Sequence, residues 1–173
     1  IEALEPVGFG TERVEENVKE IFPDCKVVRL DIDSAKTKTA HEKIIGEFES
    51  GKIDVLVGTQ MVSKGLDFER VRLVGILNAD ALLNFPDFRA YERAFQMMAQ
   101  VSGRAGRKNR RGLVVIQSST PEHPVIELVR NNDFQSLYEE QLLQRSSYKY
   151  PPYYRLIYIN IKPISPKENS SGL

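Results

Sequence analysis

The stretch VLVGTQMVSKGLDF, residues 55–68, places an apolar strand directly before a loop that carries a hydroxyl, an amide, a lysine, a glycine and a carboxylate. Polar loops that follow strands are where open α/β sheets bind their ligands. Segments 53–57, 71–77 and 113–117 are short, rich in β-branched residues and almost continuously apolar, as expected for strands covered on both faces. Residues 26–30 are predicted to form a further strand.

Helical patterns alternate with these strands along the chain. Thr11 is expected to cap the first helix, and Gly51 is expected to end the second. Since strands that alternate with helices pair in parallel, the sequence predicts an α/β fold with a mainly parallel sheet flanked by helices. The predicted helices cover residues 11–22, 39–50, 89–102 and 124–145, the last of these split near 131–133.

A second motif, QVSGRAGR at residues 100–107, sets two arginines three residues apart, each directly after a glycine. In a helical turn this spacing places Arg104 and Arg107 on one side. A guanidinium group is planar and permanently charged, so two of them suit a polyphosphate whose negative charge spreads over several oxygens as a phosphoryl group leaves. An arginine that stabilises this charge is called an arginine finger. A solvated basic helix end would show the same local pattern. The interpretation as an arginine finger therefore depends on the strand and loop at 55–68.

The composition is that of an ordinary soluble domain, with 41% hydrophobic and 28% charged residues in a chain of 173. The 24 Lys and Arg residues balance 24 Asp and Glu residues, so any DNA contact must come from local placement of charge. No apolar run approaches the length of a membrane span, and the first residues lack the order of a signal peptide. These observations predict a cytoplasmic protein with no membrane partner.

Metal-ligating side chains are scarce in the sequence. Cys25 with His41 and His123 cannot supply the four ligands of a zinc site, so no metal site is predicted. Asp31 and Asp33 have the chemistry of metal ligands, but a solvated loop that caps the next helix is the favoured interpretation.

Together, GTQMVSKGLDF and QVSGRAGR resemble motifs V and VI of superfamily 2 helicases, which lie on the second RecA-like lobe. Further segments, in the order GFGTE, LNAD, PDFRAYERAFQ and PEHP, resemble the PriA family of replication restart helicases over residues 8 to about 155. This resemblance implies a RecA-like helicase C-terminal lobe, related to P-loop NTPases, over residues 1–150. Residues 151–173 would then begin a C-terminal domain that is truncated or disordered here.

The resemblance also implies a role for each candidate site residue. Arg104 and Arg107 would reach the γ-phosphate of a nucleotide on the other lobe, and Gln100 would help to order that site. Gly65 would allow the backbone to approach the nucleotide, and Asp67 suits a ribose hydroxyl. The residues implied in binding nucleic acid are Gly58, Thr59, Gln60 and Lys64.

Cofactors and partners follow from the resemblance alone. ATP and Mg²⁺ would be shared with the first helicase lobe, and the zinc of the family would be held by an insertion outside this chain. The implied partners are forked and single-stranded DNA, the first lobe, primosome proteins and single-strand binding protein. The implied role is the ATP-driven motor that acts in primosome assembly and restart of stalled replication forks.

The parts of an ATP site that belong to the first lobe are missing from the sequence. Residues 46–52 match the first seven positions of a P-loop, but Ile53 stands where the magnesium-binding Ser or Thr is required. This segment also closes a helix and feeds a strand, the reverse of a P-loop. Since no other stretch supplies a P-loop or an acidic DExx box, the chain by itself is predicted to hydrolyse no ATP.

Two other classes of protein stay open at this point. Another superfamily 2 translocase would keep the two motifs but not the GFGTE, LNAD and PDFRAYERAFQ segments together. A noncatalytic nucleic-acid-binding module, or a nucleotide-sugar enzyme of similar architecture, would not need the two arginines. For the tyrosines at 148, 150, 153 and 154, packing against another domain is favoured over stacking on unpaired bases.

Overall fold

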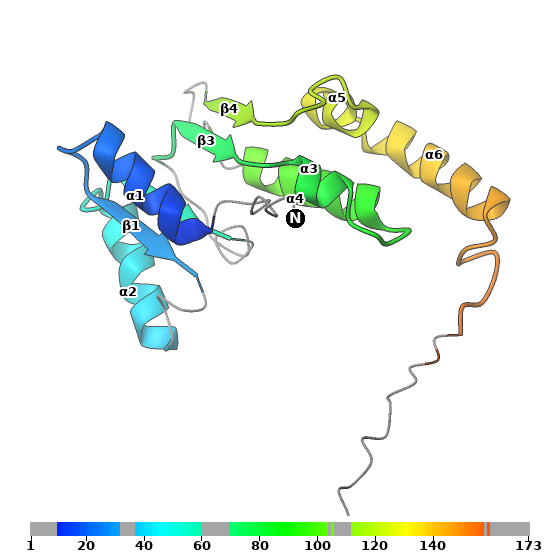
Figure 1. Cartoon of the computed structure of the whole chain (residues 1–173), viewed down its shortest axis with the longest axis horizontal. Coiled ribbons are helices and arrows are strands. Elements are labelled where there is room, and N and C mark those ends of the chain that lie inside the picture. Colours follow the sequence, from blue (N-terminus) through cyan, green and yellow to red (C-terminus); the bar gives the residue numbers. More distant parts are fainter. Residues whose placement is uncertain are drawn as a thin grey trace, which may run out of the picture.

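The computed structural model describes residues 10–31, 37–59, 70–103, 105, 112–157 and 159, with the exception of the Lys38 side chain. Its four strands match the predicted ones to within three residues at each end and pair in parallel (Figure 1). Leu30 pairs with Gly58 in the first pair, and Ile76 pairs with Ile116 in the second. The strands are β1 (Val27–Leu30), β2 (Val55–Gly58), β3 (Leu73–Ile76) and β4 (Leu113–Ile116).

Helices occupy the segments between the strands, as predicted. One further short helix, α3, follows β3 and was not expected from the sequence. Its four residues are too few to show a helical period, so the pattern alone could not reveal it. The helices are α1 (Thr11–Ile21), α2 (Lys38–Glu49), α3 (Asp80–Leu83), α4 (Ala90–Ser102), α5 (Pro124–Asn131) and α6 (Phe134–Ser147).

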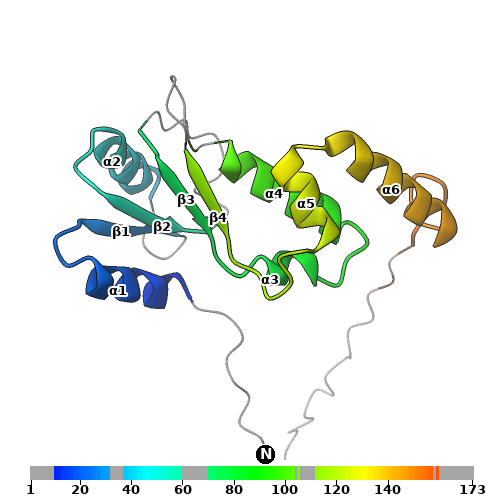
Figure 2. The ribbon, with the colours of Figure 1, turned by 90° about the horizontal axis from the view of Figure 1, so that it is seen from above.

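The described strands form two separate parallel pairs, whereas the sequence predicted one sheet. Helices α1 and α2 cover opposite sides of the β1–β2 pair (Figure 2). On the β3–β4 pair, Ile76 and Ile116 pack against the helical core, but the other face is exposed at Leu73 and Leu113. The expectation of coverage on both faces is therefore wrong for this pair, because the described helices pack on one side of it only.

The main core lies among α3, α4, α5 and the start of α6. Helix α4 supplies its centre, because Ala94, Phe95 and Met98 recur at the spacing of one helical face and are all buried. A smaller cluster joins Leu30 of β1 to Ile45 of α2. The buried members of the main core are Ala79, Leu83, Ala94, Phe95, Met98, Val125, Ile126, Val129 and Leu137.

The predicted cap at Thr11 is wrong. Gly10 is the N-cap of α1, and the Thr11 hydroxyl donates instead to Oδ2 of Asp31 at 2.6 Å. Asp31 is only 7% exposed, so its interpretation as part of a solvated loop is also wrong. The end of the second helix is confirmed, since Gly51 follows it with φ of +76°, a conformation that glycine adopts freely.

The predicted split between the last two helices is confirmed. Asn132 adopts the left-handed conformation with φ of 53°, and Asp133 caps α6 by accepting from the Ser136 backbone N–H at 3.0 Å. Residues 155–161 alternate in the sequence in the way typical of a strand, but the described residues among them, 155–157 and 159, are not in a strand. A strand needs a neighbour to satisfy its backbone groups, and the alternating pattern alone cannot supply one. Of residues 151–173, expected to begin a truncated or disordered domain, 158 and 160–173 lie outside the described residues.

Candidate functional site

The carboxyl ends of β1 and β2 lie side by side, because Leu30 pairs with Gly58. Thr59 follows β2 directly and is exposed, with its hydroxyl at the end of a strand. This is the position at which parallel sheets present side chains to a ligand. The structure therefore places Gly58 and Thr59 where the sequence predicted a contact site.

An ion-pair network fixes the neighbouring end of β1. The Nε atom of Arg29 lies 3.5 Å from Oδ2 of Asp31 and 3.6 Å from Oε2 of Glu15 on α1. The same Asp31 oxygen accepts the hydroxyl of Thr11. Helix α1 is thus tied to the end of β1 beside Thr59. Sequence reasoning missed Arg29, although its position in the predicted strand, two residues before Asp31, favoured both side chains on the same side of the chain.

A second pair of strand ends is joined by Asp80. This carboxylate follows β3 and accepts the Ser118 hydroxyl at 2.6 Å and the Ser119 backbone N–H at 2.8 Å, both from the loop after β4. Asn78, with φ of 52°, turns the chain between β3 and α3. These hydrogen bonds, the Ser118 hydroxyl first among them, lower the pKa of Asp80. The LNAD segment therefore serves to lock two loops together.

The Asp80 contacts predict a dependence of stability on pH. Because the folded-state pKa of Asp80 lies below the unfolded value of 3.8, its contribution is present above that pH and is lost as the pH falls through the folded pKa. We expect Asp80→Asn to lower the urea midpoint at pH 7, and we expect the difference from the parent chain to shrink below pH 3.8. Asp24→Asn, at an exposed turn, is the control. A constant difference at all pH values would contradict this role.

Helix α4 carries Gln100 on its last turn, where the side chain is exposed, and Gly103 is its C-cap. The two predicted arginines follow in the sequence at 104 and 107 but lie outside the described residues. The structure thus shows the helix that leads into the arginine motif, with its inner face packed in the core. The remaining predicted site residues outside the described part are Gln60, Lys64, Gly65 and Asp67.

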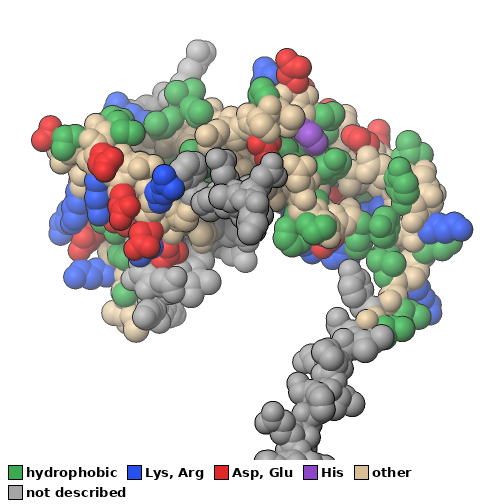
Figure 3. Space-filling view, viewed as in Figure 1, with side chains coloured by type: hydrophobic (Ala, Val, Ile, Leu, Met, Phe, Trp, Pro, Cys, Tyr) green, Lys and Arg blue, Asp and Glu red, His purple; other side chains and the backbone are tan. Residues whose placement is uncertain are grey.

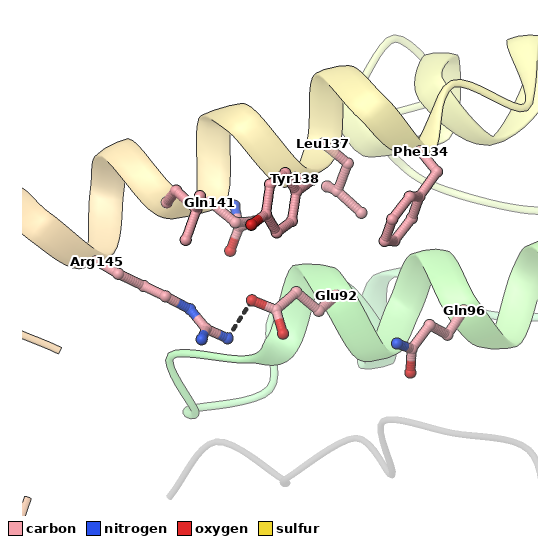
Figure 4. Close-up of a pocket in the computed structure, with 8 residues that line it drawn as sticks. Glu92, Gln96, Phe134, Leu137, Tyr138, Gln141 and Arg145 are labelled. Carbon is pink, nitrogen blue, oxygen red and sulfur yellow. Dashed lines mark hydrogen bonds and ion pairs between the residues drawn. The ribbon is translucent and has the colours of Figure 1, made fainter. Parts of the chain in front are cut away.

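A groove of about 130 Å³ runs between α4 and α6 (Figure 4). Arg145 and Glu92 point toward one another at one end, and Phe134 lies at the other. On the face shown in Figure 3, hydrophobic side chains gather over α6, whereas acidic and basic side chains are interspersed over α1 and α2. The remaining lining residues are Gln96, Leu137, Tyr138, Gln141 and Leu142.

Neither a metal centre nor a membrane span is found in the described residues. No group of three or more His, Cys, Asp or Glu side chains there is arranged to hold a metal ion. No described helix combines the length and apolar character needed to cross a bilayer. His123 is the N-cap of α5, where its Nδ1 accepts the Val125 backbone N–H at 3.2 Å.

Parallel strand pairs flanked by helices, with polar residues at the strand ends, fit the architecture of a RecA-like helicase lobe. Residues 10–109 match the family model described as helicase conserved C-terminal domain, and the chain belongs to that family. It is similar to the replication restart protein PriA of Bacillus subtilis, with 47% identity over 154 residues that cover 89% of this chain and 19% of the relative.

Further relatives carry the same name. The Synechocystis protein is 47% identical over 150 residues, which cover 87% of this chain and 18% of the relative. The Treponema pallidum protein is 46% identical over 150 residues, which cover 87% of this chain and 23% of the relative. The predicted resemblance to PriA is confirmed. The chain spans about a fifth of the length of these relatives.

Proposed function

We propose that this chain is the second motor lobe of an ATP-dependent DNA helicase that acts in primosome assembly and in the restart of stalled replication forks. The observation that carries the proposal is the helicase C-terminal family match over residues 10–109, which includes the arginine motif after α4. The name of the relatives, replication restart protein, supports the setting in which the motor acts.

The proposed contacts with the nucleotide come from residues at and after the C-terminal end of α4 and from Gly65 and Asp67. ATP and Mg²⁺ are held mainly by the first lobe, and Arg104 and Arg107 neutralise the charge that develops as the γ-phosphate leaves. Gln100, exposed on the last turn of α4, orders the site beside them. Asp67 accepts a ribose hydroxyl, and Gly65 lets the backbone approach the nucleotide.

The DNA side rests on the end of β2. The exposed Thr59 hydroxyl and the Gly58 backbone hold a phosphate of single-stranded DNA, and Gln60 and Lys64 extend that contact. Because Asp67 follows Thr59 by only eight positions in the sequence, nucleotide-dependent closure of the two lobes shifts the DNA contacts. Repeated closure and opening produce translocation and unwinding.

The proposed partners follow the same division of labour. Forked and single-stranded DNA and the first lobe of the same protein contact this lobe directly. Primosome proteins and single-strand binding protein act with the complete helicase, and the setting is the cytoplasm. The proposed role at replication forks can be tested independently of the ATPase site. A pull-down compares how much of the complete protein is recovered with single-strand binding protein on forked DNA and on blunt duplex.

The isolated chain should hydrolyse no ATP, because the phosphate cradle and magnesium ligands it lacks are separate from the arginines it has. We expect phosphate release by the purified 173-residue chain to stay at the buffer rate, with or without single-stranded DNA. DNA-stimulated turnover that disappears in Arg107→Ala would show that the chain carries a complete site.

Replacement of Thr59 should uncouple the motor. In the complete protein, we expect Thr59→Ala to weaken single-stranded DNA binding and unwinding while DNA-independent hydrolysis is largely kept, since the hydroxyl contacts a phosphate of DNA and not of ATP. Thr39→Ala, exposed on α2, is the matched control. Binding measured by fluorescence anisotropy and basal phosphate release decide the case. An equal loss of both would place Thr59 in the nucleotide site.

A further inference from the structure

One arginine holds the N-terminal end of α4 to two other segments. Nη2 of Arg145, near the end of α6, pairs with the carboxylate of Glu92 in the first turn of α4, and Nη1 donates to the Pro151 carbonyl at 3.1 Å. The two side chains point toward one another across the groove in Figure 4. They are 15% and 28% exposed, so water screens their interaction less than it would at the surface.

Aromatic contacts extend this arrangement. The Phe88 ring, in the loop before α4, is stacked on Tyr150 with centroids 4.7 Å apart and planes 8° apart. The Arg145 guanidinium carbon lies 5.2 Å from the centroid of the same Phe88 ring. We define Phe88, Glu92, Arg145, Tyr150 and Pro151 as the α4 clamp. Through Arg145, the clamp connects the start of α4 with the segment that leads toward residue 151 and beyond.

The helix that the clamp holds leads, along the sequence, to the proposed catalytic arginines. Helix α4 has 13 residues, about 20 Å at 1.5 Å per residue, and its last residue, Ser102, precedes Arg104 by two positions. Ala94, Phe95 and Met98 fix its inner face in the core. Since a close-packed interior transmits strain, we expect a displacement at the clamp to change the position of the other end of α4.

Stability alone does not explain the clamp. Among the described residues, Arg145 Nε is buried and has no hydrogen-bond partner, which costs free energy that an apolar side chain at the same position would avoid. Glu92 lies at the positive end of the α4 dipole and Arg145 at the negative end of the α6 dipole, so the pair favours one alignment of the two helix ends. An arrangement that lowers stability but fixes how two helices align is expected where the position of a helix matters for function.

We propose that Arg145 is a positioning residue for the arginines at 104 and 107, and that it couples the segment around Tyr150 and Pro151 to the ATP site. This inference rests on the proposed function of those arginines. Tyr150 and Pro151 thereby bias the placement of the catalytic side chains without contacting the nucleotide. The PDFRAYERAFQ segment, which contains Phe88 and Glu92, obtains a physical role in the same way.

The test compares steady-state ATP hydrolysis of variants of the complete protein in the presence of forked DNA. A misplacement of about 1 Å can cost 10²-fold in rate, so we expect Arg145→Met to lower kcat by about tenfold or more. KM for ATP should change less than about twofold, because Arg145 does not touch the nucleotide. Arg145→Lys, which keeps the charge and lacks the fork, should lose less. Arg130→Met, an exposed pair with Glu127 on α5, is the matched control and should leave kcat unchanged.

A double-mutant cycle separates positioning from folding. Glu92→Gln and Arg145→Met should be non-additive in kcat, since each breaks the same contact. An unchanged kcat with only a lower melting temperature would overturn the inference, and so would parallel losses of kcat and ATP affinity. If Arg145→Met does not fold, Arg145→Lys provides the test: a lower kcat with an unchanged KM for ATP supports the inference, and an unchanged kcat overturns it. If Arg104→Lys and Arg107→Lys both keep near-normal turnover in the same assays, the proposed function itself fails, whatever Arg145 does.

Discussion

Arg104→Lys and Arg107→Lys should each reduce ATP turnover of the complete protein by about 10³-fold, the effect typical of arginine fingers. Lysine keeps the positive charge but replaces a planar fork with a point charge on a different stem. If the two side chains serve the transition state, ATP binding should weaken far less than turnover. Steady-state phosphate release beside direct ATP titration measures both quantities.

The exposed Arg130 on α5 provides the control for this experiment. Arg130→Lys removes the same fork from a pair with Glu127 on the surface and should leave turnover unchanged. Near-normal turnover in both lysine variants at 104 and 107 would identify the GRxGR motif as a structural or DNA-facing basic patch. The rival interpretation of a noncatalytic nucleic-acid-binding module would then be favoured.

Phe95→Ala should cost about 3–5 kcal/mol in free energy of unfolding, the usual range for removal of a buried phenylalanine. Phe95 is 4% exposed, lies at the centre of the helical core and has its ring 6.1 Å from that of Phe134. The cavity left by the ring cannot collapse easily between packed helices. Urea unfolding of the 173-residue chain, followed by circular dichroism, measures the loss.

Phe85→Ala is the matched control, because Phe85 is 56% exposed in the loop before α4. We expect a change within about 0.5 kcal/mol for this variant. A cost below about 1 kcal/mol for Phe95→Ala, with a cooperative transition, would mean that α4 is not centred in the core. The clamp would then have no rigid helix through which to act.

The sequence predicted most of the local structure, because the signals were local. Four apolar runs became four strands, and Asn132 with Asp133 ended one helix and began the next. The Thr11 cap failed for a tertiary reason. Its hydroxyl is used by Asp31, twenty residues away, and no local pattern reveals such a partner.

The difference between local signals and long-range contacts also explains which parts of the site could be predicted. Strand followed by polar loop identified the end of β2, and the structure places Thr59 there in an exposed position. The Arg29–Glu15 pair spans 14 positions of the sequence, and the Glu92–Arg145 and Phe88–Tyr150 contacts of the α4 clamp span 53 and 62 positions. The resemblance identified PDFRAYERAFQ as a family segment without showing the role of its residues. The structure shows that Phe88 contacts Tyr150 and that Glu92 contacts Arg145.

Binding of a transition-state analogue tests the central claim most directly. In the complete protein, the affinity for ADP with aluminium fluoride and Mg²⁺ should fall by about 10³-fold in Arg107→Lys, in proportion to lost transition-state stabilisation. The affinity for a nonhydrolysable ATP analogue should stay within about threefold of the parent, since ground-state contacts are largely shared with the first lobe. Equal affinities of parent and variant for the aluminium fluoride complex would contradict the assignment of Arg107 as an arginine finger.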